Sequence, residues 1–405
     1  MVVSTRESEG VDVMDLLRYE QGPPHELFAR MRAEAPVCWN RTQDGTGFWS
    51  VTGHEEIAHV SKHPELFSNA AEGIFLHRDQ AIPLDINRDN LIYMDPPRHA
   101  AYRKIVATVF TPRTVSALED VVRRLSTTLL DAAVAKERFD WVADVAVPLP
   151  LGVLVSLMAL PEEDATQLHT WTEMLGESCR VPEPAAGLSV LPEMGAYLQA
   201  QVERQLEAGM EDSLVMRLHR ARVDGEQLTE TEIINFFSLL TFAGNDTVRN
   251  TAAAGMNLFL DHPDQWRLLC ENPELIGSAV EEVLRCTSVV QYFRRTALTD
   301  VELGGRHIAA GDPLILWYTS GSRDESVYSS PDVFDITRTT HDHMAFGGGG
   351  RHFCLGAGLA RLELRVLFEE TIRRLPDIAR DGAISREPSS WAHIIDRLPM
   401  RLTRV

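Results

Sequence analysis

The longest run of apolar residues at helical spacing begins after Leu228 and extends to about Leu260. It opens with Thr229 and, three residues later, Glu232, which is the capping-box pattern of a helix N-terminus. A helix this long and apolar is expected to lie at the centre of the fold. The polar sequence Gly-Asn-Asp-Thr at 244–247 interrupts the run, and a polar notch in a buried helix is a candidate site.

Shorter periodic patterns predict additional helices and a few strands along the rest of the chain. The expected elements are a short helix within 11–33, a hairpin from 37–39 and 47–52, helices at 54–60, 151–160 and 194–206, a helix that starts near Asp95, and a hairpin over 301–316. Residues 180–192 are rich in proline and are expected to form a loop. Residues 67–93 are also expected to be a loop, and a loop this long inside a compact domain is usually functional.

Composition narrows the possible function classes. The chain has 405 residues and a formal net charge of −20, which argues against a nucleic-acid partner because phosphate binding needs a basic surface. Five scattered cysteines without a CxxC pair favour a reducing compartment over a disulfide framework. The N-terminal residues contain no apolar core for a signal peptide or anchor, and the most apolar window, 142–160, is broken by charge and proline.

The second stretch with chemistry is residues 345–356, Ala-Phe-Gly-Gly-Gly-Gly-Arg-His-Phe-Cys-Leu-Gly, which we call the cysteine loop. Consecutive glycines permit backbone conformations that a Cβ forbids and allow a flat group to lie against the chain. Leu355, Leu359, Leu362 and Val366 predict a helix that follows, so Cys354 lies at a helix N-terminus, where N–H groups stabilise a thiolate. Such a thiolate can ligate iron. The alternatives are a phosphate-binding loop, which lacks the P-loop Lys-Ser/Thr, and a cysteine that merely packs in the core.

This string resembles the haem-binding loop of the cytochromes P450, in which a Phe and a Gly-rich turn precede Cys-x-Gly. The commonest pattern has the Phe seven residues before the Cys, whereas here Gly347 has that position and Phe346 is eight before Cys354. The variant is similar to that of some actinobacterial sterol and lipid hydroxylases. The resemblance implies one domain over residues 1–405, mainly α-helical with a small β lobe, with haem between the long central helix and the cysteine loop.

Further motifs in register support the resemblance. Glu282 and Arg285 match the family's structural Glu-x-x-Arg, and Arg338 is expected to be their third partner. His99 and Arg103 lie four residues apart on one helical face. By spacing alone they are a solvated basic face, but the resemblance makes them ligands of the haem propionates. It assigns binding of haem b to the following residues: His99, Arg103, Ala243, Gly244, Arg295, Phe346, Gly347, His352, Cys354 and Gly356, with Cys354 as the iron ligand.

The notch in the central helix resembles the family's oxygen-groove motif, which ends in an acid and a threonine. A hydroxyl and a carboxylate can position and relay the protons that dioxygen activation needs. The resemblance therefore makes Asp246 and Thr247 the catalytic pair. A simple packing kink, with Asp246 in a salt bridge, is the alternative from the residues themselves.

The implied activity is insertion of one oxygen atom from O2 into a C–H bond of a hydrophobic substrate. Electrons are expected from NAD(P)H through a reductase and a small ferredoxin, because no flavin or iron–sulfur motif is present in the chain. The resemblance implies a cytoplasmic enzyme without a membrane anchor. A haem-thiolate peroxygenase or coupling enzyme and a haem-binding sensor without turnover are the alternatives.

The resemblance also predicts the substrate pocket. Its walls are expected to come from residues 70–92, 180–192, the central helix, 289–292 and 390–393. The predicted substrate residues are Leu239, Val289, Val290, Gln291 and Trp391, with Gln291 and His393 as the polar groups. A mostly apolar pocket of this kind suits a steroid, terpenoid, polyketide or lipid-like molecule.

Overall fold

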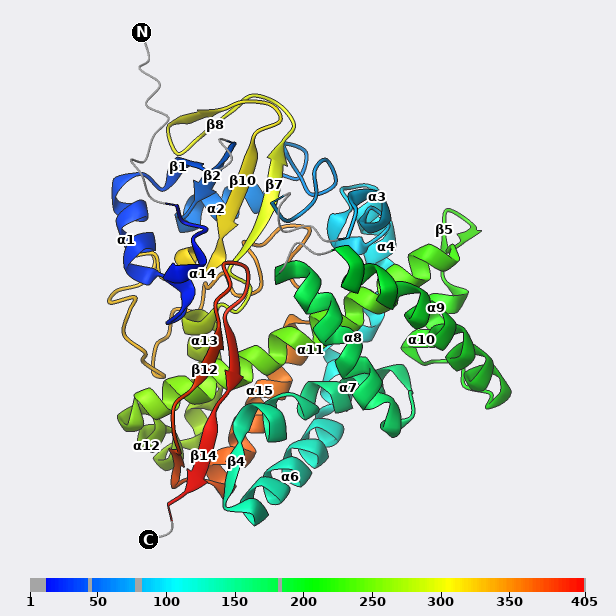
Figure 1. Ribbon diagram of the computed structural model, residues 1–405, viewed down its shortest axis with the longest axis vertical. Helices are drawn as coiled ribbons and strands as arrows, with labels where there is room; N and C mark the ends of the chain where they lie inside the picture. Colours follow the sequence, from blue (N-terminus) through cyan, green and yellow to red (C-terminus); the bar gives the residue numbers. More distant parts are fainter. Residues whose placement is uncertain (1–11, 43–45, 77–81, 181–183, 404–405) are drawn as a thin grey trace.

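A computed structural model describes residues 12–42, 46–76, 82–180 and 184–403. The long central helix predicted from the sequence is α11, Glu230–Asp261. Its capping box is formed as expected: Thr229 Oγ1 accepts from the Glu232 N–H at 3.2 Å, and Glu232 Oε2 accepts from the Thr229 N–H at 2.8 Å. The helix packs against α7, α8, α9, α13 and α15, so it is the axis of the helical part of the molecule (Figure 1).

The fold is mainly α-helical with small sheets, as the resemblance implied. The helices are α1 His25–Glu34, α2 His54–Lys62, α3 Leu84–Asn87, α4 Arg98–Ala107, α5 Pro112–Ala117, α6 Glu119–Lys136, α7 Pro148–Met158, α8 Ala165–Arg180, α9 Pro184–Glu207, α10 Leu214–Arg220, α11, α12 Pro263–Glu271, α13 Ile276–Thr287, α14 Tyr318–Gly321 and α15 Ala357–Arg374. The strands are β1 Val37–Arg41, β2 Gly47–Val51, β3 Phe67–Ser68, β4 Arg138–Asp140, β5 Arg222–Val223, β6 Glu226–Gln227, β7 Tyr292–Ala297, β8 Val301–Leu303, β9 Arg306–Ile308, β10 Pro313–Trp317, β11 Ile378–Arg380, β12 Ser385–Glu387, β13 Ile394–Arg397 and β14 Pro399–Leu402.

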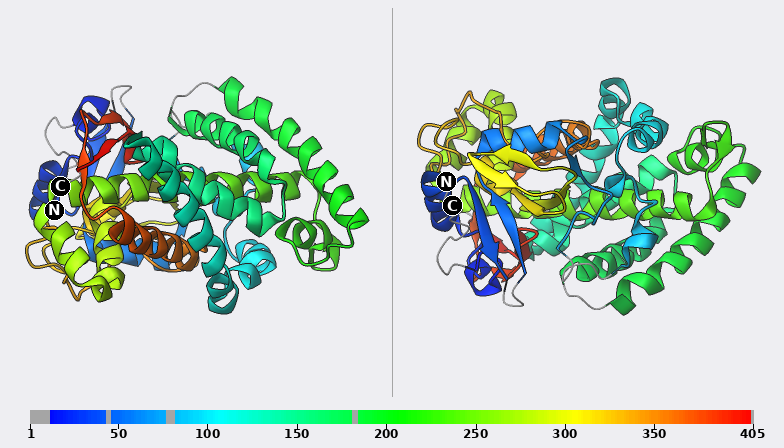
Figure 2. Two further views of the ribbon diagram at one scale, coloured as in Figure 1. Left: turned by 90° about the horizontal axis from the view of Figure 1, so that it is seen from below. Right: turned by 90° about the horizontal axis from the view of Figure 1, so that it is seen from above.

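The largest sheet has five strands in the order β1-β2-β10-β7-β3. The predicted hairpin is present, with Val37 opposite Val51 and Arg41 opposite Gly47. The expected single hairpin over 301–316 is wrong in part: β8 and β9 pair with each other, but β10 leaves them and joins the large sheet between β2 and β7. The buried apolar residues of β10 explain this, because they pack on both faces of the large sheet. Figure 2 shows these strands gathered at one end of the molecule and most helices at the other.

The proline-rich stretch at 180–192 is helical where the structure describes it, which corrects the sequence-based expectation of a loop; residues 181–183 lie outside the described residues. Helix α8 continues to Arg180, and α9 begins at Pro184 and contains Pro192. A proline at a helix start lacks only an N–H that has no helical partner anyway. Within α9, Val190, Met194 and residues 198 and 202 form a buried i, i+4 stripe. This packing outweighs the cost of one interior proline, about 3 kcal/mol.

A buried ion cluster connects α13 to the segment before the cysteine loop. Glu282 accepts from both Nε and Nη2 of Arg285 at 2.7 and 2.8 Å. Arg338 Nε lies 3.2 Å from Glu282 Oε2, so the predicted third partner is confirmed. Arg285 also donates to the carbonyl oxygens of Ser322, Pro331 and Val333, so its guanidinium holds two further backbone segments in place.

The most apolar window of the sequence forms a π-helical turn, Val142–Ala146, followed by α7. Within the described ranges, no helix combines the length and the apolar composition that crossing a membrane requires.

Candidate active site

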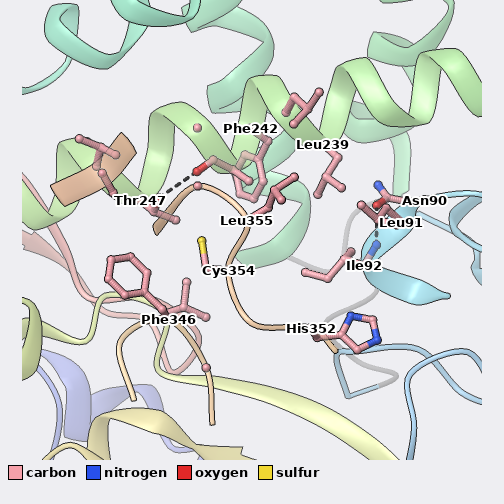
Figure 3. A pocket seen from close by; sticks show the side chains of 18 of the residues that line it. Asn90, Leu91, Ile92, Leu239, Phe242, Thr247, Phe346, His352, Cys354 and Leu355 are labelled. Carbon is pink, nitrogen blue, oxygen red and sulfur yellow. Dashed lines mark hydrogen bonds between the residues drawn. The ribbon is translucent and has the colours of Figure 1, made fainter. Parts of the chain in front are cut away.

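A cavity of about 360 Å³ lies between the middle of α11, the cysteine loop and the segment before α4. Its wall is mostly apolar, with polar side chains in a few groups. Figure 3 shows Cys354 below α11, with Thr247 and Phe242 above it and Asn90 at the side. The cavity therefore joins the two stretches that the sequence singled out.

The four consecutive glycines of the cysteine loop have two distinct functions. Gly347 and Gly350 have φ values of 90° and 73°, which side chains rarely adopt. A Cβ on Gly350 would lie 2.0 Å from the carbonyl oxygen of Ser61, and one on Gly348 would lie 2.9 Å from that of Ile57. Gly348 and Gly350 thus allow the loop to pack directly on α2. Nothing lies within 4 Å of a Cβ on Gly347, which lines the cavity.

Cys354 faces the cavity and is exposed there, although it lies deep in the protein. Its N–H donates to the carbonyl oxygen of Phe346 at 3.1 Å, which closes the loop. Burial raises the pKa of the Cys354 thiol, while the N–H of Gly356 and the charges of Arg103 and Arg361 act in the opposite direction. Figure 3 shows the sulfur pointing up toward α11.

Phe346 packs within the loop and lines the cavity. The Arg361 guanidinium stands over its ring, 4.5 Å from the centroid, and the Phe353 ring is 6.2 Å away at a steep angle. The Phe346 side chain is thus held by two neighbours, while its carbonyl oxygen accepts the bond from Cys354.

The middle of α11 presents backbone to the cavity. Ala243 and Gly244 are exposed although they lie in the interior of a buried helix, because only the cavity is beside them. Thr247 Oγ1 donates to the Ala243 carbonyl oxygen at 2.8 Å, and the helix nevertheless continues without a break. Small residues here leave space for a flat group between α11 and Cys354.

Asp246 has a different position from Thr247. It is buried, it does not line the cavity, and its Oδ1 lies 2.9 Å from Nη2 of Arg249. Arg249 also bonds Glu173 of α8, whose side chain is 43% exposed. A chain of charged groups therefore connects the buried carboxylate to solvent.

Four basic side chains line one region of the cavity: His99, Arg103, Arg295 and His352. The two imidazole centroids are 4.2 Å apart. Burial and the charge of Arg103 lower the pKa of His99 to about 4, and burial lowers the pKa of His352 well below its usual value. Arg103 also donates to the carbonyl oxygen of Phe353 at 2.6 Å. Arg294, the alternative to Arg295, turns away and donates to Glu72 and Phe75 carbonyls.

These residues fit a haem. Nδ1 of His99 and Nε2 of His352 are buried and have no hydrogen-bond partner among the described residues. Glu363, which is buried, is the only acidic residue of the described cavity wall. Arg103 and Arg295 therefore have no other carboxylate there to neutralise their charges. A ligand that is flat, apolar and carries anionic groups at one edge would satisfy these donors. Cys354 would offer such a cofactor's iron a sulfur ligand.

The predicted substrate residues divide into two groups. Leu239, Val289, Val290 and Trp391 line the cavity as expected. Gln291 does not: its amide nitrogen, Nε2, donates to the Ser389 carbonyl oxygen at 2.7 Å, away from the cavity. This is a correction, and its cause is the backbone pairing of residues 289–293 with 389–393, which turns Gln291 into the structure.

His393, the second expected polar group, is also outside the described wall. It is half-buried, it lies near Gly22, and desolvation and the Arg386 charge lower its pKa to about 4. The prediction placed residues 390–393 in one wall, whereas alternate residues of an extended segment point to opposite sides.

Several polar residues of the cavity were not predicted from the sequence. They include Asn87, Asn90, Asn235, Ser238 and Glu363. One signal was available: steps of four back from Thr247 reach Ala243, Leu239 and Asn235, which share one face of the helix. Glu363 carried no signal, because a glutamate on a helix that also holds arginines is ordinary in sequence.

Comparisons with known proteins agree with this geometry. Residues 196–376 match the profile described as Cytochrome P450. Among curated relatives, the methyl-branched lipid omega-hydroxylase of Mycobacterium tuberculosis is 36% identical over 92% of this chain and 90% of its own length. Linalool 8-monooxygenase of Pseudomonas putida is 37% identical over 87% of this chain and 88% of its own length. The steroid C26-monooxygenase of Rhodococcus jostii is 35% identical, over 95% and 83%.

Solved structures have the same fold. A Mycobacterium marinum cytochrome P450 in complex with pseudoionone superimposes with a TM-score of 0.90 at 32% identity, covering 98% of this chain and 100% of the other. A Bacillus megaterium enzyme in complex with testosterone gives a TM-score of 0.81 at 29% identity, with coverages of 94% and 99%. The similarity extends over nearly the whole length of each pair of chains.

Proposed function

Because this chain belongs to the cytochrome P450 family and is a monooxygenase of hydrophobic substrates, we propose that Cys354 is the thiolate ligand of a haem b held between α11 and the cysteine loop. The observation that carries the proposal is the exposure of Cys354 to a cavity whose opposite wall is the bare backbone of Ala243 and Gly244. A bound haem-thiolate supplies dioxygen activation and transfer of one oxygen atom to a C–H bond.

The rest of the cofactor's contacts follow from the charges around the cavity. His99, Arg103, Arg295 and His352 would hold its anionic edge, since they gather in one region and two of their ring nitrogens lack other partners among the described residues. Gly347 and Gly356 would let the loop backbone lie close to the ring, and Phe346 would pack beside the thiolate.

Proton delivery is assigned to Thr247 and Asp246. The reaction consumes O2, two electrons and two protons, places one oxygen atom in the substrate C–H bond and releases the other as water. The Thr247 hydroxyl lines the cavity and can hold a water there. Asp246 would bring protons from the Glu173 side. Arg249 stays protonated and does not pass a proton on. The Asp246 carboxylate must therefore break its ion pair with Arg249 and rotate before it can carry a proton.

Electrons would come from NAD(P)H through a reductase and a small ferredoxin. A docking site for the ferredoxin is available where the cysteine loop meets solvent: Phe353 is 39% exposed, and Arg351 beside it is exposed. This pair of an aromatic side chain and a cation lies on a chain whose net charge is −20. It would therefore attract an acidic partner to one place on the surface.

The free thiols of Cys38, Cys270, Cys286 and Cys354 support a cytoplasmic location.

The substrate would be a lipid, terpenoid or steroid. The curated relatives act on a methyl-branched lipid, linalool and steroids, according to their names. The cavity of this chain is consistent with such molecules, since apolar side chains dominate its wall.

The decisive experiment is the carbonyl spectrum of the reduced protein. Cys354→Ser should abolish the thiolate-type Soret shift, whereas Cys38→Ser and Cys286→Ser should retain it because those thiols do not line the cavity. Loss of the shift in a control variant that still binds haem would reject Cys354 as the ligand. Ferredoxin-dependent hydroxylation of a lipid or terpenoid by the wild type tests the rest of the proposal.

A further inference from the structure

Two sets of polar side chains stand out on the cavity wall, which also carries further polar residues such as Asn69, Ser238, Thr251 and Thr287. One is the basic group around His352 and Arg103. The other is a set of side-chain amides near the start of α11: Asn235 of α11, Asn87 of α3, and Asn90, which follows α3. All three are at most 9% exposed. We call them the amide group.

Direct contacts hold the amide group together. Asn235 Nδ2 donates to the Ile86 carbonyl oxygen at 3.3 Å, so the start of α11 is tied to α3. Asn87 Nδ2 donates to the Ile82 carbonyl oxygen at 3.1 Å. Asn90 Oδ1 accepts from the Ile92 N–H at 3.3 Å. These bonds also fix which end of each amide is which.

Each amide keeps one polar atom without a hydrogen bond within the described chain. These atoms are Oδ1 of Asn87, Oδ1 of Asn235 and Nδ2 of Asn90. Two acceptors and one donor are therefore available in an otherwise apolar part of the wall. A hydroxyl group matches this set, since it donates one hydrogen bond and accepts others.

The basic side chains of this region leave no free cation facing the amide group. Arg98, at the start of α4, contacts Asp89 at 2.6 Å and Glu232 at 3.0 Å. Arg88 is exposed and does not line the cavity. A carboxylate in the amide group would therefore meet two amide oxygens and no neighbouring free cation, since the cations of the described wall, Arg103 and Arg295, lie in the basic group; this is unfavourable.

The amide group is remote from the reaction centre. Asn235 and Gly244 are nine residues apart on α11, which is roughly 13 Å along a helix axis. Leu239 and Phe242 line the cavity between them. Figure 3 shows Asn90 on the opposite side of Leu239 and Phe242 from Thr247.

From these contacts we propose that the amide group binds a hydroxyl at one end of an elongated apolar substrate and so presents the opposite end to Cys354 and Thr247. This inference rests on the proposed function and names its substrate class: an apolar alcohol of about the length that separates Asn235 from Gly244, oxidised at a carbon remote from its hydroxyl. A distance of this kind is what allows one hydrogen-bonded group to set regiochemistry.

The test uses the haem-loaded protein and isothermal titration calorimetry with three probes of one chain length: dodecan-1-ol, dodecyl methyl ether and dodecanoate. The alcohol can donate and accept, the ether only accepts, and dodecanoate is an anion. Dodecan-1-ol should bind about tenfold more tightly than either of the others, the effect of one or two hydrogen bonds. Equal affinity for all three, no binding of any, or preference for dodecanoate would overturn the proposal.

Variants locate the effect. Asn235→Leu should weaken binding of dodecan-1-ol several-fold and leave the ether unchanged, whereas Asn40→Leu is the matched control. Asn40 is buried and donates to a backbone carbonyl as Asn235 does, but it lies on β1, outside the cavity wall. Equal effects of the two variants on alcohol binding would overturn the proposal, and thermal unfolding checks that both are folded.

Asn90→Asp is a second test that does not depend on packing. The substitution keeps the Oδ1 that accepts from Ile92 but replaces the free donor with an oxygen. Binding of the ether should fall several-fold, whereas binding of the alcohol should be retained because its hydroxyl can donate. Unchanged binding of the ether would contradict a role for Asn90.

Arg88→Ala decides whether any dodecanoate binding uses that exposed cation instead of the amide group.

Product analysis separates this inference from the proposed function. Dodecan-1-ol should be oxidised at or near its terminal methyl, and Asn235→Leu should spread the products along the chain. Oxidation next to the hydroxyl would overturn the orientation while leaving the monooxygenase assignment intact. A Cys354→Ser protein that still shows the thiolate spectrum would instead refute the haem site.

Discussion

Asp246 and Arg249 form an ion pair one helical turn apart on α11, with 2.9 Å between Oδ1 and Nη2. Thr247, the next residue, points into the cavity instead. The two members of the proposed proton-delivery pair therefore lie on different faces of one helix, and Arg249 stands between the carboxylate and Glu173. Burial opposes the charge on Arg249, but the carboxylates of Asp246 and Glu173 raise its pKa, so it remains a cation.

Replacement of Asp246 tests the relay directly. Asp246→Asn keeps the shape of the side chain but removes the proton carrier, so the rate of product formation should fall by about 10²–10⁴. Substrate binding and the carbonyl spectrum should be unchanged, because Asp246 is outside the cavity wall. Turnover is measured as the rate of product formation with NAD(P)H in excess. Asn250→Leu, on the same buried side of α11, is the control, and an equal rate loss there would indicate damage to the helix rather than to the relay.

The Glu282 cluster should dominate the stability of the region behind the cysteine loop. Glu282→Gln leaves Arg285 and Arg338 buried without their counter-ion, and breaking a buried pair costs about 3–5 kcal/mol. Urea unfolding measures the change in free energy. The exposed pair formed by Glu211 with Arg220 is the comparison: Glu211→Gln should cost about 1 kcal/mol or less. Similar losses for the two variants would contradict this difference.

Glu363 should make stability fall as the pH rises. Burial raises the pKa of this carboxyl from 4.5 to about 8, so the folded protein holds a proton that the unfolded chain releases. The contribution of this retained proton to the free energy of unfolding is fully present below pH 4.5. It is lost as the pH rises to 8. Glu363→Gln should therefore gain stability relative to the wild type across this window, on the order of 4 kcal/mol at its upper end. Free energies of unfolding at a series of pH values measure this; parallel curves for the two proteins would show that Glu363 does not titrate there.

Trp391 and Gln291 should give opposite results, although the sequence-based prediction assigned both to the pocket. Trp391 lines the cavity between Phe75 and Phe242, with ring centroids 5.6 and 5.8 Å away. Trp391→Ala should weaken binding of an apolar ligand roughly tenfold. Gln291→Ala should lower stability by about one hydrogen bond, ~1 kcal/mol, without a change in the dissociation constant. Calorimetric titration with dodecan-1-ol separates the two; a binding loss in Gln291→Ala alone would restore the sequence-based assignment.

The sequence by itself determined the features that depend on local chemistry. The cap at Thr229, the bond from Thr247 to Ala243 and the β1–β2 hairpin are set by residues within a few positions of one another, and all are present. The cysteine loop was also recognisable from its own residues, because four consecutive glycines followed by a cysteine and then a helix are a rare combination.

Only the tertiary structure decided which distant residues meet. Gly348 and Gly350 are required by contacts with α2, about 290 positions earlier in the chain. Helix α9 begins at one proline and contains another because a buried stripe of side chains stabilises it. The side chain of Gln291 points away from the cavity because its strand pairs with residues near 390. The amide group combines α3 with α11. Local propensity and periodicity carry no information about such long-range packing, and the energies of burial and pairing that settle it exist only once the chain is folded.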